Sequence, residues 1–376
     1  MPADVIIIGA GVVGAACAWY LTRAGLRVAV LDRGPVAGGT TGAGEGNLLV
    51  SDKPAGPELE LALHSATLWR ELADVVGGFE YEPKGGLVVS ETAPSLAALE
   101  QFANAQRTSG VDAIAVPAGE LSTYEPRIAA NLAGGYYYPQ DSQVQPMLAA
   151  ARLLAGARAA GAQVRVGVKV TGLMRDGERV IGVRTRTGEL TAGAVVNAAG
   201  TWAGEVAKLA GVDVPVSPRR GFILVTEPLP PMVRHKVYAS SYVDAVGSDD
   251  AALQVSPVIE GTRAGTILIG SSRERVGMDR TMSVDVLRRL AAAAVRLFPV
   301  LAGVTAIRAY CGFRPYSPDH LPIIGPDPRA PGLLHACGHE GAGVGLAPAT
   351  GELVAAALSG HPPAVDPVPF RPERFG

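Results

Sequence analysis

Cysteine is scarce in this sequence of 376 residues, which contains Cys17, Cys311 and Cys337, far apart from one another. No C-x-x-C pair and no cluster of histidines accompanies them, so neither a disulfide framework nor an iron–sulfur or zinc site is encoded within this chain alone. Because so few cysteines are typical of a reducing compartment, we expect a cytoplasmic protein without a metal site.

Charge is also sparse. Charged residues make up 18% of the chain, and the net charge is −2. This balance argues against a protein that binds nucleic acid or an anionic membrane surface. Apolar residues make up 48% of the chain, which is typical of a globular protein with a large core. The length suits two or three domains, or one unit that carries an inserted subdomain.

Apolar runs long enough to span a bilayer are absent beyond the first one, which extends from Val5 to Leu21. A run of this length would suit a signal peptide or a marginal membrane span. However, Asp4 stands where a basic flank is expected, no small-residue cleavage site follows, and glycines interrupt the run. We therefore expect no transmembrane segment.

The same run has the pattern of a dinucleotide-binding motif. An apolar strand, 5–8, leads into Gly9-Ala10-Gly11-Val12-Val13-Gly14 and then into an apolar helix whose N-terminus would face phosphates. Gly9 suits the tight turn, Gly11 lets the backbone approach a pyrophosphate, and Gly14 lets the helix pack closely on the strand.

A second apolar strand, 27–31, supports this interpretation. It ends in Asp32, eighteen residues after Gly14, where an acidic side chain reaches the hydroxyls of a ribose. Strand, glycines, helix, strand and acid therefore predict a Rossmann-like unit at the start of the chain.

A glycine-rich stretch, 38–47, follows directly and contains Gly39, Thr40 and Thr41. One interpretation is a plain surface loop. We favour a loop that lays backbone N–H groups and two hydroxyls along a cofactor, because it comes so soon after the ribose acid.

The remaining segments predict the fold class, which is α/β (α+β overall). Further helices are predicted from Pro57 and at 95–109, 147–160, 284–297 and 348–358, and strands at 163–170, 180–185, 189–191, 194–202 and 333–336. Strands at 86–89, 135–138, 221–226, 253–258 and 266–270 have few helices between them, which is typical of an antiparallel sheet. We expect a Rossmann-like domain made of 1–80, 141–213 and 311–376, with an interleaved antiparallel-sheet substrate domain made of 81–140 and 214–310.

A third glycine-rich loop, 338–345, indicates which dinucleotide is bound. It follows a strand and precedes a helix, like a second Rossmann turn, but only about thirty residues remain after it. Because no second strand with a terminal acid can follow, we expect this loop to complete the first site from the far end of the chain. Its helix N-terminus would stabilise the anionic reduced ring of a flavin. A nicotinamide dehydrogenase, the alternative, would need only the first unit.

Several motifs together resemble the FAD-dependent D-amino-acid oxidase superfamily. They are Gly9-x-Gly11-x-x-Gly14 with Asp32, Gly39-Thr40-Thr41, Ala198-Ala199-Gly200-x-Trp202, Gly312-Phe313-Arg314-Pro315 and Gly338-His339-x-Gly341-x-Gly343. Within this superfamily the chain resembles the branch that holds glycine oxidase, one component of hydrogen cyanide synthase, and D-hydroxyproline dehydrogenase, the last through residues 41–53. The resemblance implies FAD, a small amino acid as substrate, and oxygen or another electron acceptor.

The resemblance also implies which residues bind FAD. Val170 would contact the adenine through its backbone, and residues near Gly46 and Asn47 would line the isoalloxazine. The full predicted set is Gly9, Gly11, Val12, Val13, Gly14, Asp32, Arg33, Gly39, Thr40, Thr41, Gly46, Asn47, Leu48, Val170, Ala199, Gly200, Trp202, Gly338, His339, Gly341, Gly343, Val344 and Gly345.

Members of the family oxidise a C–N bond: the α-hydrogen leaves as hydride to flavin N5, and an imine forms. Such a step needs no obligatory side-chain base, so it depends on orientation and on an anchor for the substrate carboxylate. The resemblance assigns this role to Arg314, because a guanidinium grips a carboxylate in a bidentate fork. The alternative is a structural arginine paired with an acid such as Asp319.

Other site residues are less directly indicated. Tyr238, Tyr242 and Tyr316 are candidates to offer a hydroxyl to the substrate, and simple packing is the alternative for each. His339 is expected to contact the cofactor rather than to transfer protons.

Three other functions stay open. An aromatic hydroxylase of related fold would carry a Gly-Asp pair where Gly338-His339 stand. A subunit of a heteromeric dehydrogenase would pass electrons to a partner with an iron–sulfur centre or a flavin, whereas the simpler arrangement is a homo-oligomer. The third is a flavin-binding protein without catalysis.

Overall fold

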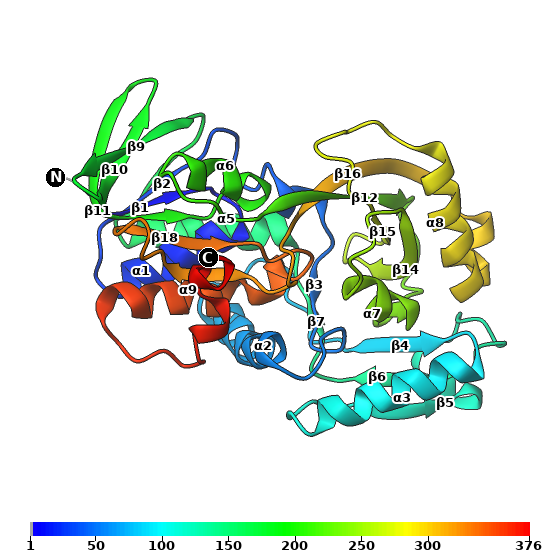
Figure 1. Ribbon diagram of the computed structural model, residues 1–376. Helices are drawn as coiled ribbons and strands as arrows, with labels where there is room; N and C mark the ends of the chain where they lie inside the picture. Colours follow the sequence, from blue (N-terminus) through cyan, green and yellow to red (C-terminus); the bar gives the residue numbers. More distant parts are fainter. Residues whose placement is uncertain (1–2) are drawn as a thin grey trace.

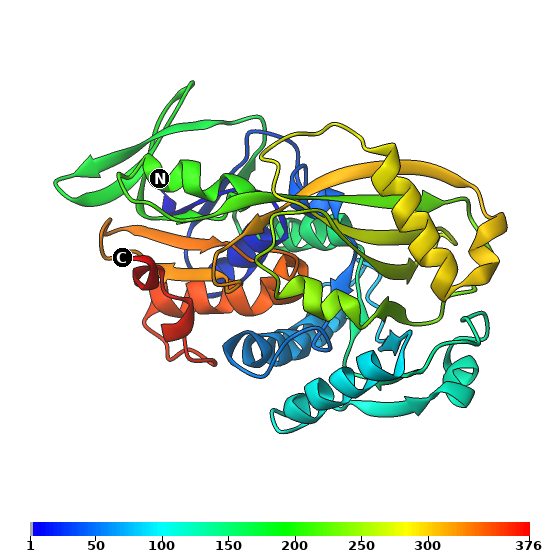
Figure 2. The ribbon, with the colours of Figure 1, turned by 45° about the vertical axis from the view of Figure 1, so that its right-hand side comes forward.

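Two large sheets lie side by side in the protein (Figure 1). The structure is a computed structural model that describes residues 3–376, except for the side chain of Asp244. The sheet at the left of Figure 1 is mostly parallel, and the one at the right is mostly antiparallel. Two long strands, β12 (Ser217–Thr226) and β16 (Ala306–Tyr316), extend from the second sheet toward the first (Figure 2).

The first sheet has the order β17-β18-β11-β1-β2-β8, in which β17 alone is antiparallel to its neighbour. Its strands are β1 (Ala3–Ile8), β2 (Val28–Leu31), β8 (Gln163–Arg165), β11 (Gly188–Asn197), β17 (Ile323–Pro326) and β18 (Leu333–Cys337). The outer part of β11 also forms an antiparallel ribbon with β10 (Arg179–Thr185), which pairs with β9 (Val170–Asp176).

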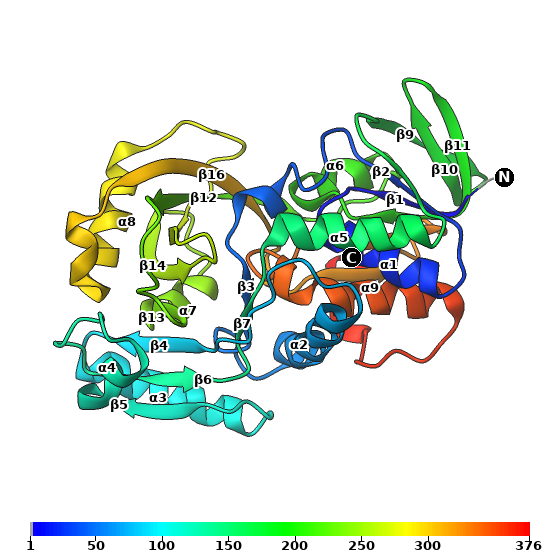
Figure 3. The same ribbon diagram turned by 180° about the vertical axis from the view of Figure 1, so that it is seen from behind.

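Strand β1 is buried on both faces, as its continuous apolar run predicts. Val5 and Ile7 enter the core on one face, and Ile6 and Ile8 enter the core on the other. The first face is covered by α1 (Val12–Arg23), α2 (Pro57–Val75), α5 (Pro146–Ala159) and α9 (Gly343–Ser359) (Figure 3). The second is covered by the short α6 (Ala203–Lys208) and the β9–β11 ribbon.

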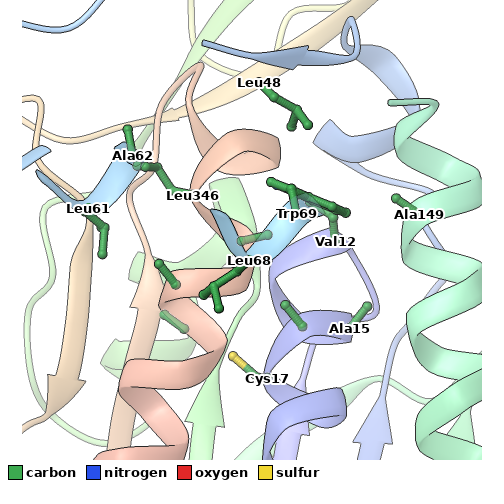
Figure 4. Packing of buried hydrophobic residues seen from close by; sticks show 14 of the residues in the cluster. Val12, Ala15, Cys17, Leu48, Leu61, Ala62, Leu68, Trp69, Ala149 and Leu346 are labelled. Carbon is green, nitrogen blue, oxygen red and sulfur yellow. The ribbon is translucent and has the colours of Figure 1, made fainter. Parts of the chain in front are cut away.

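The core under the first face is where these helices meet (Figure 4). Val12 and Ala15 of α1 lie near Trp69 of α2, with Ala149 of α5 and Leu346 of α9 close by. The small side chains of α1 let the neighbouring helices approach closely, and Trp69 fills the space between them.

Two glycines shape the turn between β1 and α1. Gly9 has φ +119°, which is strained for other residues, and a side chain there would overlap Ala198 O. A methyl group on Gly14 would overlap Gly9 O, so α1 starts in direct contact with the turn.

The second sheet has the order β16-β12-β15-β14-β13-β4-β6-β5, and only the β13–β4 pair is parallel among the described residues. Its other strands are β4 (Gly86–Ser90), β5 (Ile114–Pro117), β6 (Gly134–Tyr138), β13 (Lys236–Ala239), β14 (Gln254–Gly261) and β15 (Ile267–Arg273). Its helices are α3 (Ala93–Arg107), α4 (Leu121–Tyr124), α7 (Ser241–Val246) and α8 (Val284–Leu297). A small ladder of β3 (Asn47–Leu48) and β7 (Ser142–Gln143) lies where the chain passes between the sheets.

The strands fall on the two sides of the predicted domain division, except that β16 runs across its boundary at residue 311. The division itself stays a prediction. The predicted fold class is confirmed, because a mostly parallel sheet covered by helices is joined to a mostly antiparallel sheet.

Some predicted elements were wrong in detail. The strand expected at 163–170 is two strands, β8 and β9, because Gly167 (φ +73°) turns the chain between them. The strands expected at 189–191 and 194–202 are one strand, β11, which ends at Asn197, and Gly200–Trp202 form a short helical turn instead. The last long helix begins at Gly343 rather than Pro348, which lies inside it. No helix in residues 3–376 is long and apolar enough to cross a membrane.

Asp141 links the segments that cross between the sheets. Its Oδ1 accepts hydrogen bonds from the N–H groups of Val50 (2.8 Å) and Ser51 (3.2 Å), and its Oδ2 bonds to Ser51 Oγ. Ser51 Oγ also lies 2.5 Å from the hydroxyl of Tyr238 on β13. Burial raises the pKa of Asp141 to about 7.

We expect Gly14→Ala to destabilise the fold by about 1–3 kcal/mol, because the added methyl group must push α1 away from the turn. Urea unfolding of the purified protein measures this change. Gly119→Ala, which adds a methyl group in open space, is the control and should stay within about 0.5 kcal/mol of wild type. Equal stability of both variants would contradict the close contact.

The pKa of Asp141 predicts a pH dependence of stability. The pKa of the Asp141 carboxyl group rises from its ordinary value of 3.8 to about 7 on folding, so the folded state binds the carboxyl proton more tightly than the unfolded state does. Its contribution to stability is therefore present in full below about pH 4 and is lost as the pH rises through about 7. We expect the free energy of unfolding of Asp141→Asn to depend less on pH across this window, and that of the exposed control Asp112→Asn to follow wild type. If the free energy of unfolding of Asp141→Asn changed with pH as steeply as that of wild type, the carboxyl group would ionise in the fold as it does in the unfolded chain.

Candidate cofactor and substrate site

A cavity of about 640 Å³ lies where the carboxyl ends of β1 and β2 meet the second sheet. All three glycine-rich loops reach its wall. Among the residues predicted for the site, those that line the cavity are Gly9, Gly11, Val12, Val13, Asp32, Arg33, Gly39, Thr40, Thr41, Asn47, Val170, Ala199, Gly200, Trp202, Tyr242, Arg314, His339, Gly341, Gly343 and Val344.

Other predicted residues lie behind the wall and support it. Gly14 packs against the turn at Gly9, Gly46 packs against Val144 O, and Gly345 lies beside the backbone of Asn47 and Leu48. Leu48 belongs to the core shown in Figure 4. Gly338 packs against Ile323. The structure assigns these residues to packing rather than to the cavity surface.

Asp32 forms one end of the cavity, at the end of β2. Its Oδ2 accepts a hydrogen bond from Ala10 N–H and its Oδ1 accepts one from Gly34 N–H, each at 2.7 Å. The carboxylate is thereby held beside the first glycine turn, where it faces the cavity as a ribose-binding acid does. Next to it, the Arg33 guanidinium lies 4.1 Å from the ring centre of Trp202, and both side chains line the cavity.

The N-terminus of α1 forms the middle of the cavity. Gly11 and Val13 line it, and the N–H of Val12 donates to Thr41 Oγ1 at 3.1 Å. This bond holds the loop 39–47 over the start of the helix, so backbone N–H groups and threonine hydroxyls surround one space. Such a space suits a pyrophosphate.

A second helix N-terminus, that of α9, reaches the cavity from the far end of the chain. Gly343 and Val344, the first residues of α9, line the wall. His339 beside them is buried, and its Nε2 lies 2.9 Å from Thr350 Oγ1. Burial lowers the pKa of His339 to about 3, so the ring is neutral and does not serve as an acid near neutral pH.

Arg314 lies at the end of the cavity formed by the second sheet. Its Nη1 donates to Ser272 O at 2.8 Å. Gly221 on the paired strand β12 leaves space for the guanidinium, since a Cβ at this position would overlap it. No carboxylate of the described residues forms an ion pair with it: Asp319 pairs with Arg374 instead, at 2.6 Å. Burial, together with the nearby cation of Arg273, lowers the pKa of Arg314 to about 10.

The tyrosines divide into two groups. Tyr242 of α7 lines the cavity, with the guanidinium of Arg273 4.6 Å from its ring centre. Tyr238 is fully buried behind it, with ring centres 5.1 Å apart and its hydroxyl at Ser51, so it supports Tyr242 instead of lining the cavity. Tyr316 donates its hydroxyl to Asp249 Oδ1 at 2.9 Å and is also absent from the wall among the described residues.

Sequence patterns did not single out several residues of the wall. Glu45 and Glu340 line it, as do Lys169 and Arg280. Glu340 is held by Arg219 Nη1 (2.6 Å) and His320 Nδ1 (2.8 Å); burial alone would raise its pKa, but these bonds hold the pKa below its ordinary value. Glu45 had a visible signal, as the only acid within the glycine-rich stretch 38–47.

The residues present fit FAD. A held carboxylate, two helix N-termini and glycine loops follow one another along a single cavity, which matches the ribose, pyrophosphate and ring system of a long dinucleotide. Within residues 3–376 no group of three or more histidine, cysteine or acidic side chains is arranged to hold a metal ion.

Comparison with known proteins agrees with this assignment. Residues 4–357 match the family model described as FAD dependent oxidoreductase. Hydrogen cyanide synthase subunit HcnC of Pseudomonas aeruginosa is 31% identical, over 99% of this chain and 96% of its own length. Glycine oxidase of the same organism is 30% identical over 99% of both chains. The crystal structure of glycine oxidase from Geobacillus kaustophilus has a TM-score of 0.89 at 29% identity and covers 98% of both chains.

Gly9, Asp32 and the N-terminus of α9 line one cavity, and their roles in binding the cofactor stay predictions. The family model spans almost the whole chain. The protein belongs to the FAD dependent oxidoreductase family, and FAD is its cofactor.

Proposed function

We propose that this protein oxidises the C–N bond of a small amino acid: a D-amino acid, glycine, or a secondary amino acid such as D-proline or cis-4-hydroxy-D-proline. The relatives support this substrate class, because glycine oxidase is among them. Bound FAD would supply the acceptor for the α-hydrogen of the amino acid, which would leave as hydride and give an imine.

The observation that carries the proposal is the guanidinium of Arg314. It faces the cavity, donates only one hydrogen bond within the described chain, and pairs with no carboxylate there. Arg314 is half-buried, and a cation held partly out of water without a counterion is costly unless a ligand brings the opposite charge. The α-carboxylate of an amino acid supplies that charge, and the planar guanidinium accepts it in a bidentate fork.

The chain's own residues would act by orientation. Arg314 holds the carboxylate, and the bond to Ser272 O fixes the guanidinium in one plane. Tyr242 closes the same end of the cavity from α7, where its hydroxyl is available to the substrate. Its buried ring excludes water from the reacting carbon.

A second candidate concerns the electron acceptor. The relation to a subunit of hydrogen cyanide synthase favours a chain that works within a heteromeric dehydrogenase and passes electrons to a partner with an iron–sulfur centre or a flavin. Oxygen is the acceptor in the simpler case of an oxidase. A cytoplasmic location and the oligomeric state stay predictions.

Anaerobic mixing of the purified holoprotein with single amino acids tests the substrate class. We expect at least one of glycine, sarcosine, D-proline, cis-4-hydroxy-D-proline and the common D-amino acids to bleach the flavin absorbance. Fast reoxidation by air then indicates an oxidase, and slow reoxidation a dehydrogenase. A flavin that no amine bleaches would overturn the proposal and leave a flavin-binding protein without catalysis.

We expect Arg314→Ala to raise KM for the reducing amino acid by the equivalent of about 2–4 kcal/mol, because the substrate carboxylate loses its charged partner. Steady-state kinetics measure this change. The control is Arg308→Ala, an exposed arginine on the same strand that is not part of the cavity wall, which should keep the wild-type KM. Unchanged kinetics in Arg314→Ala would remove this residue from the substrate site.

A further inference from the structure

Glu45 is a carboxylate in an unusual position within the cavity. It lies in the loop 39–47, is 9% exposed, and lines the same wall as Arg314. Its Oε1 has no hydrogen-bond donor among the described residues, and its Oε2 has only a long contact with Asn47 Nδ2, at 3.4 Å. A buried carboxylate with so few hydrogen bonds lowers the stability of the fold, which indicates that a ligand supplies the missing partner.

The absence of a partner has a structural cause. Glu45 packs against Gly270 of β15, where a Cβ would lie 2.8 Å from Oε1. Glycine at this position makes room for the carboxylate but offers it no side-chain donor. The nearest lysine, Lys236, donates its Nζ to Glu260 Oε2, and Glu260 Oε2 also accepts the N–H of Gly46 at 3.0 Å.

The charges around Glu45 come from several strands. Burial raises the pKa of its carboxyl group, Lys236 opposes this change, and Glu260 adds to it. The titratable side chains that interact with Glu45 are Lys236 on β13, Glu260 on β14, Tyr310 and Arg314 on β16, and Tyr242 on α7. Since Lys236 and Glu260 satisfy each other, Arg314 is the one cation in this group without a carboxylate of its own in the described chain.

Glu45 and Arg314 are held in a fixed relation by the strand that carries the arginine. Tyr310 donates its hydroxyl to Gly44 O at 3.3 Å, next to Glu45. Thr40 Oγ1 donates to Phe313 O at 2.7 Å, next to Arg314. One end of the cavity therefore presents a cation and an anion that do not pair with each other and whose separation cannot change freely.

This pattern suits a zwitterion. A simple carboxylate ligand would neutralise Arg314 and leave Glu45 unpaired, whereas an amino acid supplies a charge for each. The chemistry adds a second reason. Hydride loss from the α-carbon needs the nitrogen lone pair, but an amino acid in neutral solution carries its nitrogen as an ammonium group. A proton must leave before the C–N bond is oxidised.

We propose that Glu45 binds the α-ammonium group of the amino acid held by Arg314 and accepts its proton. In this step one N–H bond of the ammonium breaks, an O–H bond forms on the Glu45 carboxylate, and the electron pair of the broken bond stays on nitrogen as the lone pair. The proposal rests on the proposed function, since it needs an amino acid in the site. A carboxyl group that holds a proton more firmly than usual is suited to this task near neutral pH.

Binding of two unreactive probes to the holoprotein tests the proposal without turnover. The first probe is 2-methylproline, which has the amine and carboxylate of proline but no α-hydrogen. The second is 2-methyltetrahydrofuran-2-carboxylate, in which an ether oxygen replaces the amine. A second pair, 2-aminoisobutyrate and isobutyrate, covers primary amines. Perturbation of the flavin absorbance and calorimetry give Kd for each, after the flavin content of every variant has been matched to wild type.

Glu45→Gln keeps the size of the side chain. We expect it to raise the Kd of the amine probe by about tenfold to 100-fold and to change the Kd of the ether probe by less than about twofold. Arg314→Ala should weaken both probes. Glu340→Gln is the matched control, because Glu340 lines the same cavity but is paired with Arg219, and it should affect both probes equally.

The outcomes separate the two proposals. If Glu45→Gln affects both probes alike or neither of them, the role of Glu45 is overturned while the carboxylate site at Arg314 stands. If Arg314→Ala weakens neither probe, or if no amine probe binds to wild type, the amino-acid site itself is overturned.

The pH dependence of probe binding gives an independent readout of the proton. As the pH falls through the pKa of Glu45, the carboxylate is neutralised, so wild type should lose affinity for 2-methylproline. The Glu45→Gln variant has no such group and should show a flat profile over the same range. A profile identical in both proteins would assign the titration to another group and overturn the proton transfer.

Discussion

The site depends on the contact between the loop 39–47 and strand β16, segments that are about 270 residues apart in the chain. Thr40 donates to the backbone of Phe313, Tyr310 donates to the backbone of Gly44, and Gly312 leaves room for Ala43. The loop belongs to the dinucleotide-binding unit and β16 belongs to the second sheet. Because this contact joins them directly, the cofactor end and the substrate end of one cavity are held in register.

The ionic side chains near the cavity wall differ in whether they have a partner of opposite charge. Most buried ionic groups near the wall have partners: Glu340 pairs with Arg219, and Lys236 pairs with Glu260. Arg314 and Glu45 differ, since neither forms an ion pair within the described chain although burial disfavours the charge of both. Glu45 is buried and Arg314 is half-buried. Charges held out of water without partners cost stability, so their presence on one wall is better explained by a ligand than by folding.

The dinucleotide site was largely predictable because its determinants are local. Gly9, Gly14 and Asp32 act through a turn, a close contact and the end of a strand, all within one βαβ unit. Part of the loop 338–345 lines the same cavity, as expected from the short length of chain that follows it, and its role in binding stays a prediction. Its helix, however, begins before Pro348, since packing of α9 on α1 overrides the local signal of the proline.

The substrate end was less predictable because it is made by tertiary contacts. Nothing in the local sequence distinguishes Tyr242, on the wall, from Tyr238 behind it, because their positions depend on how α7 packs over β13. The environment of Glu45 is decided by Gly270, far along the chain and on another sheet. The sequence shows an acid within a glycine-rich loop, but it does not show that Glu45 Oε1 has no hydrogen-bond donor among the described residues.

The division of the cavity between two sheets also explains why family membership alone does not identify a substrate. The first sheet supplies the glycines, the acid and the helix N-termini that line the dinucleotide end of the cavity. The second sheet supplies Arg314 through β16 and Tyr242 through α7, and it places Gly270 against Glu45. The two sets of residues line different ends of one cavity, although the loop 39–47 and β16 join the two sheets directly. The substrate must therefore be inferred from the charges on that wall, where Arg314 and Glu45 form no ion pair with any described side chain. A cation and an anion of this kind favour an amino acid over a simple acid or a simple amine.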